Sequence, residues 1–426
     1  MTESFLHYLW QFQYFDKKNL ATTTGETLTV LATGFLNTDA GPDFLQAKIK
    51  IDAIEWVGSV EIHLQASGWY AHRHHEDAAY ENVILHVVWD NTKPVFRKDG
   101  TPLPTLELKN LVDPGLITTY RKLTATSAAI PCKQQVDTVA ALTKLSMIER
   151  AAMIRLEQKA KAVTELFNAN QGDWEETTWQ LLVTNFGFKT NNDPFAQLAR
   201  ALPYRLVRKH RHSLLQTEAL LFGQAGFLIA KSKDTYVTQL YNEYDFLCKK
   251  YSLEEKQLHA AQWKFLRLRP ANFPTLRLAQ LAALVTTHHV FTSLLEAENA
   301  IELNRLFTFE TSAYWKTHFR LGKKALRVSG FGEQSKQSLI INVLVPVLVA
   351  YGKFTDNWHW VDRAARFLQE LPPEKNSITR LWQQNGINGK SAFESQGLLE
   401  LYKNFCTRKA CLNCAIGSAI LKPSPV

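Results

Sequence analysis

The chain has 426 residues, of which 46% are hydrophobic, 11% aromatic and 21% charged. This composition is typical of a globular protein with two or more packed regions, and it excludes collagen-like, low-complexity and disordered proteins. No apolar run approaches the length of a membrane span and the first residues lack the features of a secretory signal, so we expect a cytoplasmic protein without a membrane partner.

The net charge of +9 is unevenly distributed along the chain. Residues 1–130 hold 11 Lys and Arg against 15 Asp and Glu, a balance of −4, which leaves 38 against 25, a balance of +13, for the remainder. This asymmetry predicts a polyanion-binding surface in the second part and a carboxylate-lined cation site in the first. Solvated helix faces are the simpler alternative.

Residues 1–112 predict an α/β domain. Apolar residues at helical spacing predict an opening helix over residues 2–15, with Thr2 as its N-cap. β-Branched and aromatic runs predict strands over residues 27–32, 47–54, 56–64, 83–89 and 105–108, with a short helix within 76–82. The domain thus begins with a helix, three strands, a short helix and a strand.

From about residue 138 the pattern becomes helical. Apolar residues recur with a period near 3.6 in segments such as 147–167 and 174–186, and strand patterns become rare. We therefore expect an α+β protein in which an all-α domain over residues 138–426 follows the first domain. Residues 113–137, which contain prolines, threonines and serines, are the predicted linker.

The residues most suited to chemistry gather between positions 41 and 88. Glu61 and His63 share one face of their predicted strand, because side chains alternate along a strand. A hairpin turning near residues 54–56 brings Asp43 beside them. Two converging carboxylates repel unless a cation or proton lies between them, and Mg²⁺ and Mn²⁺ prefer oxygen ligands. We therefore predict a metal site at Asp43 and Glu61.

Several motifs resemble an uncharacterised bacterial domain-of-unknown-function family. They are GPDF at residues 41–44, GSVEIH at 58–63, LHVV at 85–88 and the W-x2-H-x-H-x2-D-x2-Y spacing from Trp69 to Tyr80. The resemblance extends to residues 269–284 and to a C-x4-C-x2-C pattern near the C-terminus. Because that family is uncharacterised, the resemblance does not indicate an activity.

Pro42-Asp43 and Glu61-Ile62-His63 are also similar to the motif of restriction-endonuclease-like nucleases, a Pro-Asp followed by acid-x-Lys on the next strand of an αβββαβ core. This resemblance implies that Asp43 and Glu61 hold Mg²⁺ or Mn²⁺ and that His63, at the lysine position, orients or deprotonates water. It also offers Glu3 of the opening helix as an additional acid. The predicted function is a metal-dependent nuclease, with a non-catalytic nucleic-acid-binding or scaffold protein as the alternative.

The histidines predict a competing zinc site. Nitrogen and oxygen ligands sufficient for Zn²⁺ are present in two sets, one formed by His63 and His86 and the other by His72, His74, His75 and Asp77. Either set would make the protein a zinc-dependent hydrolase, although the helical H-E-x-x-H signature is absent. The simpler interpretation of His86 is that it is a core histidine held by a hydrogen bond.

The cysteines predict a second metal site, because thiols stay reduced in the cytoplasm. Cys406, Cys411 and Cys414 form the C-x4-C-x2-C pattern, and Cys132 in the linker is the candidate fourth ligand for Zn²⁺ or a [4Fe-4S] cluster. Three clustered cysteines with one distant cysteine are similar to the arrangement in iron–sulfur nucleases. Three thiols packed in a terminal helix are the alternative. Cys248 lies in a predicted aromatic helix.

The helical region concentrates cations beside aromatic residues such as Tyr204, Trp263 and Phe273, which suits phosphate neutralisation and base stacking. We therefore expect a nucleic-acid partner, DNA in preference to RNA, with arginines on a solvated helix surface as the alternative. The chain lacks the phosphate-binding motifs of ATP- and NAD-dependent enzymes and the nucleophile elbow of serine hydrolases. The predicted nucleic-acid contacts are Arg205, Arg208, Lys209, Arg211, Arg267, Arg269 and Arg277.

Overall fold

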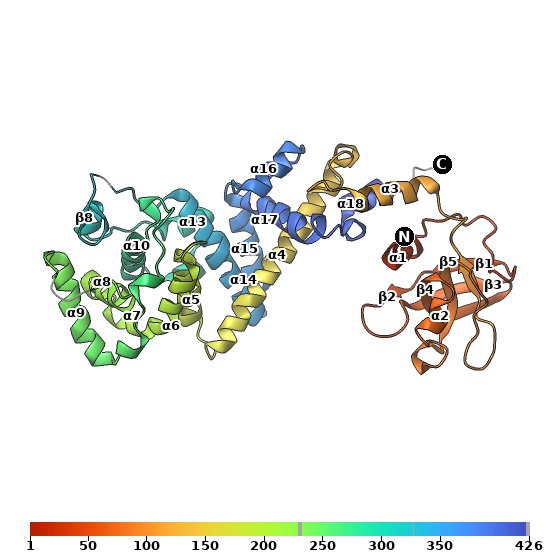
Figure 1. Ribbon diagram of the computed structural model, residues 1–426, viewed down its shortest axis with the longest axis horizontal. Coiled ribbons are helices and arrows are strands. Elements are labelled where there is room, and N and C mark those ends of the chain that lie inside the picture. The colour runs from red at the N-terminus through yellow and green to blue at the C-terminus, as the bar shows by residue number, and fades with distance from the viewer. Residues whose placement is uncertain (229–231, 327, 423–426) are drawn as a thin grey trace. The chain divides into compact units, whose positions relative to one another are not determined.

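The computed structural model describes residues 1–228, 232–326 and 328–422 and divides the chain into two compact units (Figure 1). The sheet unit comprises Met1–Met147 and Leu401–Val426, and the helical unit comprises Ile148–Glu400. The expected α+β composition with a helical second part is confirmed. The C-terminal cysteine segment, however, belongs to the sheet unit, whereas the sequence placed it in the helical domain.

The sheet unit contains a six-stranded sheet in the order β1-β3-β4-β5-β6, with β2 also paired to β3. Antiparallel pairing joins β1, β3 and β4, and parallel pairing joins β4, β5 and β6. The predicted strands are present, and within this sheet the two-residue β2 was not predicted. The bounds are β1 (Leu28–Ala32), β2 (Phe35–Leu36), β3 (Phe44–Ile51), β4 (Ile54–Gln65), β5 (Val83–Asp90) and β6 (Thr105–Glu107).

A bulge in β3 sets the register at the start of the β3–β4 hairpin. Ala47 pairs with Gly58, but Phe44 pairs with Val60, so two residues of β3 face one residue of β4. Gln46 within the bulge has a left-handed backbone with φ of 58°, a conformation typical of such bulges. The hairpin itself turns at residues 52–53, two residues earlier than expected, because Ile51 already pairs with Ile54.

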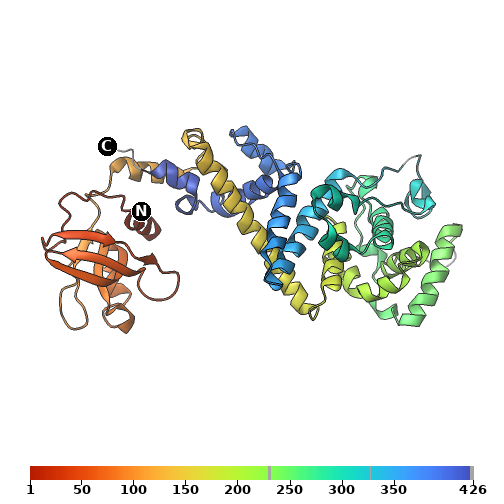
Figure 2. The same ribbon diagram turned by 180° about the vertical axis from the view of Figure 1, so that it is seen from behind.

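Helices cover both faces of the sheet, with α1 (Glu3–Gln11) on one side and α2 (Gly68–Ala71) on the other (Figures 1 and 2). Thr2 caps α1 as predicted, because its side chain accepts a hydrogen bond from the backbone N–H of Phe5. The helix expected within residues 76–82 is a single 3₁₀ turn, Ala78–Tyr80. Together α2 and this turn form the crossover that parallel pairing of β4 and β5 requires.

The predicted linker is largely ordered structure. It contains α3 (Pro114–Ala125) and a 3₁₀ turn at Val136–Thr138. The last helix, α18 (Ala415–Leu421), contacts α3 and this turn. Its Ser418 Oγ also lies 3.0 Å from Tyr8 Oη of α1. The first and last described helices, α1 and α18, therefore meet within the sheet unit.

The helical unit begins within the long α4 (Ala141–Ala169), and long connecting segments precede α10 and α13. A small hairpin of β7 (His318–Arg320) and β8 (Lys323–Lys324) was not predicted. The other helices are α5 (Trp174–Phe186), α6 (Asn192–Ala201), α7 (Tyr204–His210), α8 (Leu214–Gln224), α9 (Thr235–Tyr251), α10 (Pro274–Thr287), α11 (Val290–Glu296), α12 (Ala300–Arg305), α13 (Glu333–Leu339), α14 (Val345–Phe354), α15 (Trp358–Glu370), α16 (Ser377–Gln384) and α17 (Ala392–Glu400).

One helical segment, Glu333–Phe354, is long and apolar enough to cross a membrane, and two-thirds of its most apolar window is buried (67%). Its residues Leu339, Leu344 and Val347 are completely buried in the main apolar core of the helical unit. Burial of this kind is typical of a core helix. Placement in the cytoplasm remains a prediction.

The bulge generates a first prediction, about stability. Gln46 is exposed and left-handed, so its side chain contributes little packing while its backbone is strained. We expect Gln46→Gly to preserve or raise the free energy of unfolding, and Gln46→Val to lower it by about 1–2 kcal/mol, because a β-branched residue resists positive φ. Urea denaturation of the two variants measures the difference. Equal midpoints would contradict a left-handed residue at this position.

A second prediction concerns a buried carboxyl group in the helical unit. Glu218 is 1% exposed and accepts a 2.7 Å hydrogen bond from Tyr236 Oη. Burial raises its pKa from 4.5 to about 7, so the folded protein holds the proton more tightly than the unfolded chain. The stabilisation from this proton is therefore full below pH 4.5 and is lost as the pH rises through about 7.

Because Glu218→Gln stays neutral, it should abolish this loss. Between about pH 5 and about pH 8 we expect the wild type to lose up to about 3 kcal/mol more unfolding free energy than the variant. Denaturant titrations at several pH values measure the two slopes. Parallel pH profiles would contradict the prediction.

Candidate metal centre

Asp43 and Glu61 converge as the sequence predicts. Asp43 immediately precedes β3, and continuing the Phe44–Val60 register by one residue places it opposite Glu61. The backbone N–H of Asp43 donates to Glu61 Oε2 at 3.1 Å, and Asp43 Oδ2 accepts from the backbone N–H of Ile62 at 2.9 Å. These two hydrogen bonds fix both carboxylates at one end of the hairpin.

Three histidines surround Glu61. The ligating atoms of His63, His72 and His74 all lie within 4.8 Å of one another. His63 Nε2 lies 3.2 Å from His72 Nδ1, and Glu61 Oε1 lies 3.2 Å from His74 Nε2 and 3.7 Å from His63 Nε2. A carboxylate and three imidazoles from β4 and the crossover therefore share one small space.

These separations fit a tetrahedral metal ion. With zinc–nitrogen bonds of about 2.0–2.1 Å, the edge of a ligand tetrahedron is roughly 3.3–3.4 Å. The His63–His72, Glu61–His74 and Glu61–His63 distances of 3.2, 3.2 and 3.7 Å are close to this value. Among the described residues, buried His74 Nε2 has no partner with hydrogen-bond geometry, although Glu61 lies near it. The donor set is thus suited to hold a cation.

The surroundings orient His63. Its Nδ1 lies 2.9 Å from Nε2 of His86, which is fully buried on β5. This contact makes His86 a hydrogen-bond partner of His63 and not a co-ligand, in agreement with the core interpretation. A Cβ at Gly68 would lie 2.5 Å from His63 Cδ2, so α2 approaches the ring only because this residue is glycine. The ring of Tyr80 stacks on His74.

Burial governs the electrostatics of the cluster. Burial, the nearby Asp43 charge and, to a smaller extent, Glu3 of α1 together raise the pKa of Glu61 to about 8. Burial and the neighbouring imidazoles lower the pKa of His63 to about 3, and the pKa of His74 is lowered mainly by burial. The buried imidazoles are therefore neutral at physiological pH, the form that binds metal ions.

His7 is a site residue that sequence reasoning missed. Its Nε2 lies 3.2 Å from Asp43 Oδ2, and both side chains are 25% exposed. His7 is one turn of α1 beyond Glu3, the residue that sequence comparison had offered as an additional acid. Only the helical spacing of these two residues could have identified it, because α1 and β3 meet through tertiary packing.

The remaining predicted histidine and acid do not join the cluster. His75 Nε2 lies 3.5 Å from Glu76 Oε1, and Asp77 accepts a hydrogen bond from the backbone N–H of Ala79. The set of His72, His74, His75 and Asp77 is therefore not assembled as one zinc site. His75 and Asp77 instead line a neighbouring pocket.

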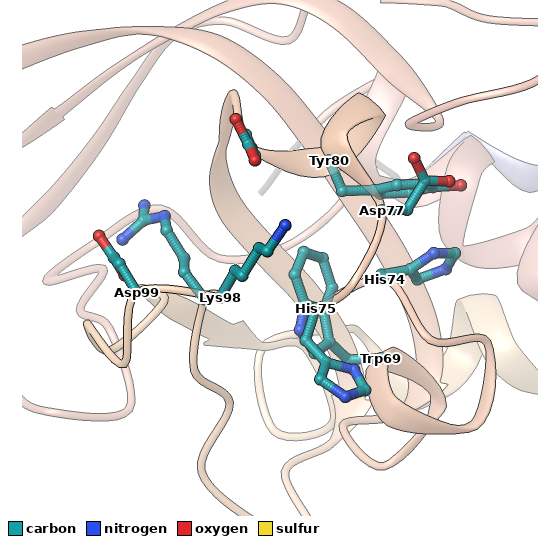
Figure 3. Close-up of a pocket in the computed structure, with 9 residues that line it drawn as sticks. Trp69, His74, His75, Asp77, Tyr80, Lys98 and Asp99 are labelled. Atoms are coloured by element: carbon teal, nitrogen blue, oxygen red, sulfur yellow. The ribbon is translucent and has the colours of Figure 1, made fainter.

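This pocket has a volume of about 400 Å³ and shares His74 with the cluster. Figure 3 shows the ammonium group of Lys98 extending into it, with His75 and Trp69 nearby and Tyr80 and Asp77 along another side. The lining residues are Trp69, His74, His75, Asp77, Tyr80, Glu81, Arg97, Lys98 and Asp99.

One predicted nucleic-acid contact is wrong. Arg277 is only 4% exposed, and its guanidinium donates hydrogen bonds to Gln280, Asn272 and Ser335. Burial lowers its pKa to about 10. Its charge is therefore used inside the helical unit and is unavailable to phosphate.

The other basic residues are more accessible. Arg205, Arg267 and Arg269 are exposed. Arg208 is exposed and paired with Glu175 at 2.6 Å, and the exposed Lys209 lies over the ring of Tyr251.

Arg211 is partly engaged, because it donates to the backbone carbonyl oxygens of Val285 and Thr286 near the end of α10.

Cys132, Cys406, Cys411 and Cys414 all belong to the sheet unit, whereas Cys248 lies in α9.

The chain matches one family at the level of sequence. No curated protein and no solved structure matches it. The sequence model of the family described as "Protein of unknown function (DUF2851)" matches residues 3–377, a segment that includes the metal-centre residues and Cys132 and ends before the last three cysteines. Because this match spans most of the chain, the protein belongs to the DUF2851 family.

Proposed function

We propose that the protein is a metal-dependent, nuclease-like phosphodiesterase whose metal ion is held by Glu61, His63, His72 and His74. The observation that carries the proposal is the clustering of the three imidazoles, two of which lie within 3.7 Å of Glu61, beside Asp43. The helix and strand order of the sheet unit, with antiparallel β3–β4 and parallel β4–β5, supports it because the resemblance to restriction-endonuclease-like nucleases implies an αβββαβ core.

The imidazole-rich donor set favours Mn²⁺ or Zn²⁺ over Mg²⁺, because nitrogen ligands suit borderline metals and Mg²⁺ prefers oxygen. The bound cation would offset negative charge on the phosphate and make nearby water more acidic. His63 then serves as a ligand, since it is only 2% exposed and its two nitrogens face His86 and His72. The nuclease resemblance had assigned it to the attacking water.

Asp43 is the better candidate for proton transfer. Unlike His63, it is partly exposed, and it adjoins Glu61 at the edge of the cluster. Its Oδ2 faces His7 Nε2 at 3.2 Å, so His7 can orient the Asp43 carboxylate or share its proton. In this scheme Asp43 accepts the proton of the attacking water, and His7 positions Asp43.

The adjoining pocket suits part of a nucleotide. A volume of about 400 Å³ lies in the range of small-molecule sites. Lys98 supplies a positive charge for phosphate, while Trp69 and Tyr80 contribute aromatic surface. Asp77 and Asp99 already accept hydrogen bonds from nearby backbone N–H groups, which reduces their repulsion of an anion. The exposed Arg205, Arg208, Arg267 and Arg269 are separate candidate phosphate contacts within the helical unit.

Substitution of His72 tests the proposed chemistry, with the exposed His359 of α15 as the control. We expect His72→Ala to reduce metal-dependent cleavage by about 100-fold or more, because a ligand is lost, and His359→Ala to change it little. Cleavage of single- and double-stranded DNA and RNA is measured with Mn²⁺, Zn²⁺ or Mg²⁺, and metal affinity is measured by calorimetry.

Two outcomes would contradict the nuclease proposal. One is a wild-type protein that cuts none of these substrates with any of the ions, and the other is a His72→Ala variant that cuts as fast as wild type. Salt-sensitive nucleic-acid binding without cleavage would then favour the non-catalytic alternative.

Substitution of Lys98 tests the role of the pocket. We expect Lys98→Ala to raise KM about five- to tenfold with little change in kcat, because it removes a phosphate contact that is equal in the ground and transition states. Lys109→Ala is the control, since Lys109 is an exposed lysine of the same unit that pairs with Asp90. Equal KM values for the two variants would argue that substrate does not occupy this pocket.

A further inference from the structure

Two segments that are distant in sequence bring four cysteines into one region of the sheet unit. Cys132 lies in the turn between α3 and α4, and the other three lie between residues 401 and 414. Cys132 and Cys411 are buried, and Cys406 and Cys414 are partly buried. The helical unit separates the two segments in the sequence, yet all four residues fall in the same compact unit.

Backbone hydrogen bonds fold each segment around its cysteines. The carbonyl oxygen of Cys132 accepts from the N–H groups of Gln135 and Val136, which forms a tight turn. In the C-terminal segment, Cys406 accepts from Lys409, Cys411 accepts from Cys414, and Cys414 caps the start of α18. Successive short turns therefore replace a continuous helix around the C-terminal cysteines.

Packing brings the two segments together, because α18, which follows Cys414, contacts both α3 and the turn at Val136–Thr138, the two elements that flank Cys132. Ionisation of Cys406 is opposed by Cys132, Cys414 and Cys411 in addition to burial, and ionisation of Cys132 is opposed by Cys414 and Cys411. Burial and the neighbouring Cys414 raise the pKa of Cys411 to about 11. Four thiols that oppose each other's ionisation can share a cation, which attracts each thiolate.

Hydrogen bonds also connect the C-terminal segment to α3 and α4. Lys409 Nζ donates to the backbone carbonyl oxygen of Thr124 at the end of α3, at 2.5 Å. The N–H of Ala415 donates to Met147 Sδ at 3.3 Å. A Cβ at Gly417 would lie 2.2 Å from the carbonyl oxygen of Cys411, so only glycine lets α18 pack this closely against the Cys411 turn.

We propose that Cys132, Cys406, Cys411 and Cys414 together bind a four-thiolate metal centre, either Zn²⁺ or an iron–sulfur cluster, that fastens the C-terminal segment to the sheet unit. Four cysteines complete the ligand set of a structural zinc ion or of a [4Fe-4S] cluster. On binding, each thiol releases its proton to solvent and its sulfur forms a bond to the metal.

The centre would act within one unit. The sequence placed Cys132 in a linker and the other three cysteines in the helical domain, but all four belong to the sheet unit. The helix that follows the centre, α18, contains Ser418, whose side chain contacts Tyr8 of α1. Tyr8 follows His7 directly in the sequence. Metal binding would therefore hold α1 in place through α18, as well as closing the chain around the inserted helical unit.

Metal analysis of the full chain tests this proposal. Protein carrying His72→Ala, which disables the proposed histidine site, is purified without oxygen so that only the cysteines contribute. We expect about one zinc, or about four irons with four sulfides, per chain. Adding Cys132→Ser or Cys411→Ser should remove at least nine-tenths of this metal, and Cys248→Ser, which changes a buried cysteine of the helical unit, should leave it unchanged.

The type of metal is identified by spectroscopy. A zinc site exchanged with Co²⁺ shows thiolate-to-cobalt charge-transfer absorption, and an iron–sulfur cluster shows visible absorption that bleaches on reduction. Absence of both zinc and iron from the His72→Ala protein, or full metal content in the Cys132→Ser variant, would overturn the proposal. Nuclease activity plays no part in this readout, so its outcome is independent of the proposed function.

If the serine variants do not fold, alkylation of the protein that keeps all its cysteines tests the proposal instead. We expect the four cysteines to be protected together and to become reactive together when the metal is removed, with proteolytic cleavage then appearing in residues 401–422. Four independent alkylation rates that a chelator does not change would overturn the proposal.

Discussion

The candidate metal centre depends on a single extra residue in β3. If the register of Ala47 with Gly58 continued without the bulge, Asp43 would lie opposite Ile62 and on the other face of the sheet from Glu61. The bulge shifts the register by one residue, so both carboxylates face the same side and exchange hydrogen bonds with the adjoining backbone. The left-handed backbone of Gln46 is the local cost of this alignment.

Parallel pairing then determines which histidines can approach Glu61. Because β4 and β5 run in the same direction, the chain must cross over the sheet between them, and this crossover carries His72 and His74 above the face that presents Glu61 and His63. The glycine at position 68 lets the crossover touch the sheet closely enough for the imidazoles to meet. The cluster is thus a product of sheet topology as much as of the residues in it.

The sequence predicted the features that local patterns encode. The strand alternation placed Glu61 and His63 on one face, and the 3.6-residue period located α5 at its observed bounds, Trp174–Phe186. Tertiary contacts were not predictable in the same way. Arg277 belongs to a basic segment, yet its guanidinium is buried among polar side chains. The contact of His7 with Asp43 and the return of the C-terminal segment also depend on packing between distant residues.

The helical unit is inserted into the sheet unit, so residues 147 and 401, between which it is inserted, must lie near each other. Contacts within the helical unit bring its two ends together. Arg155 Nε of α4 donates to Gln396 Oε1 of α17 at 2.8 Å, and a Cβ at Gly397 would lie 2.2 Å from the carbonyl oxygen of Ile148. The first and last residues of the helical unit are therefore held side by side, so folding of this unit removes most of the entropy cost of bringing residues 147 and 401 together. Only the last turns and α18 then remain to be ordered, and a metal bound by four thiolates is an interaction strong enough to order so short a segment.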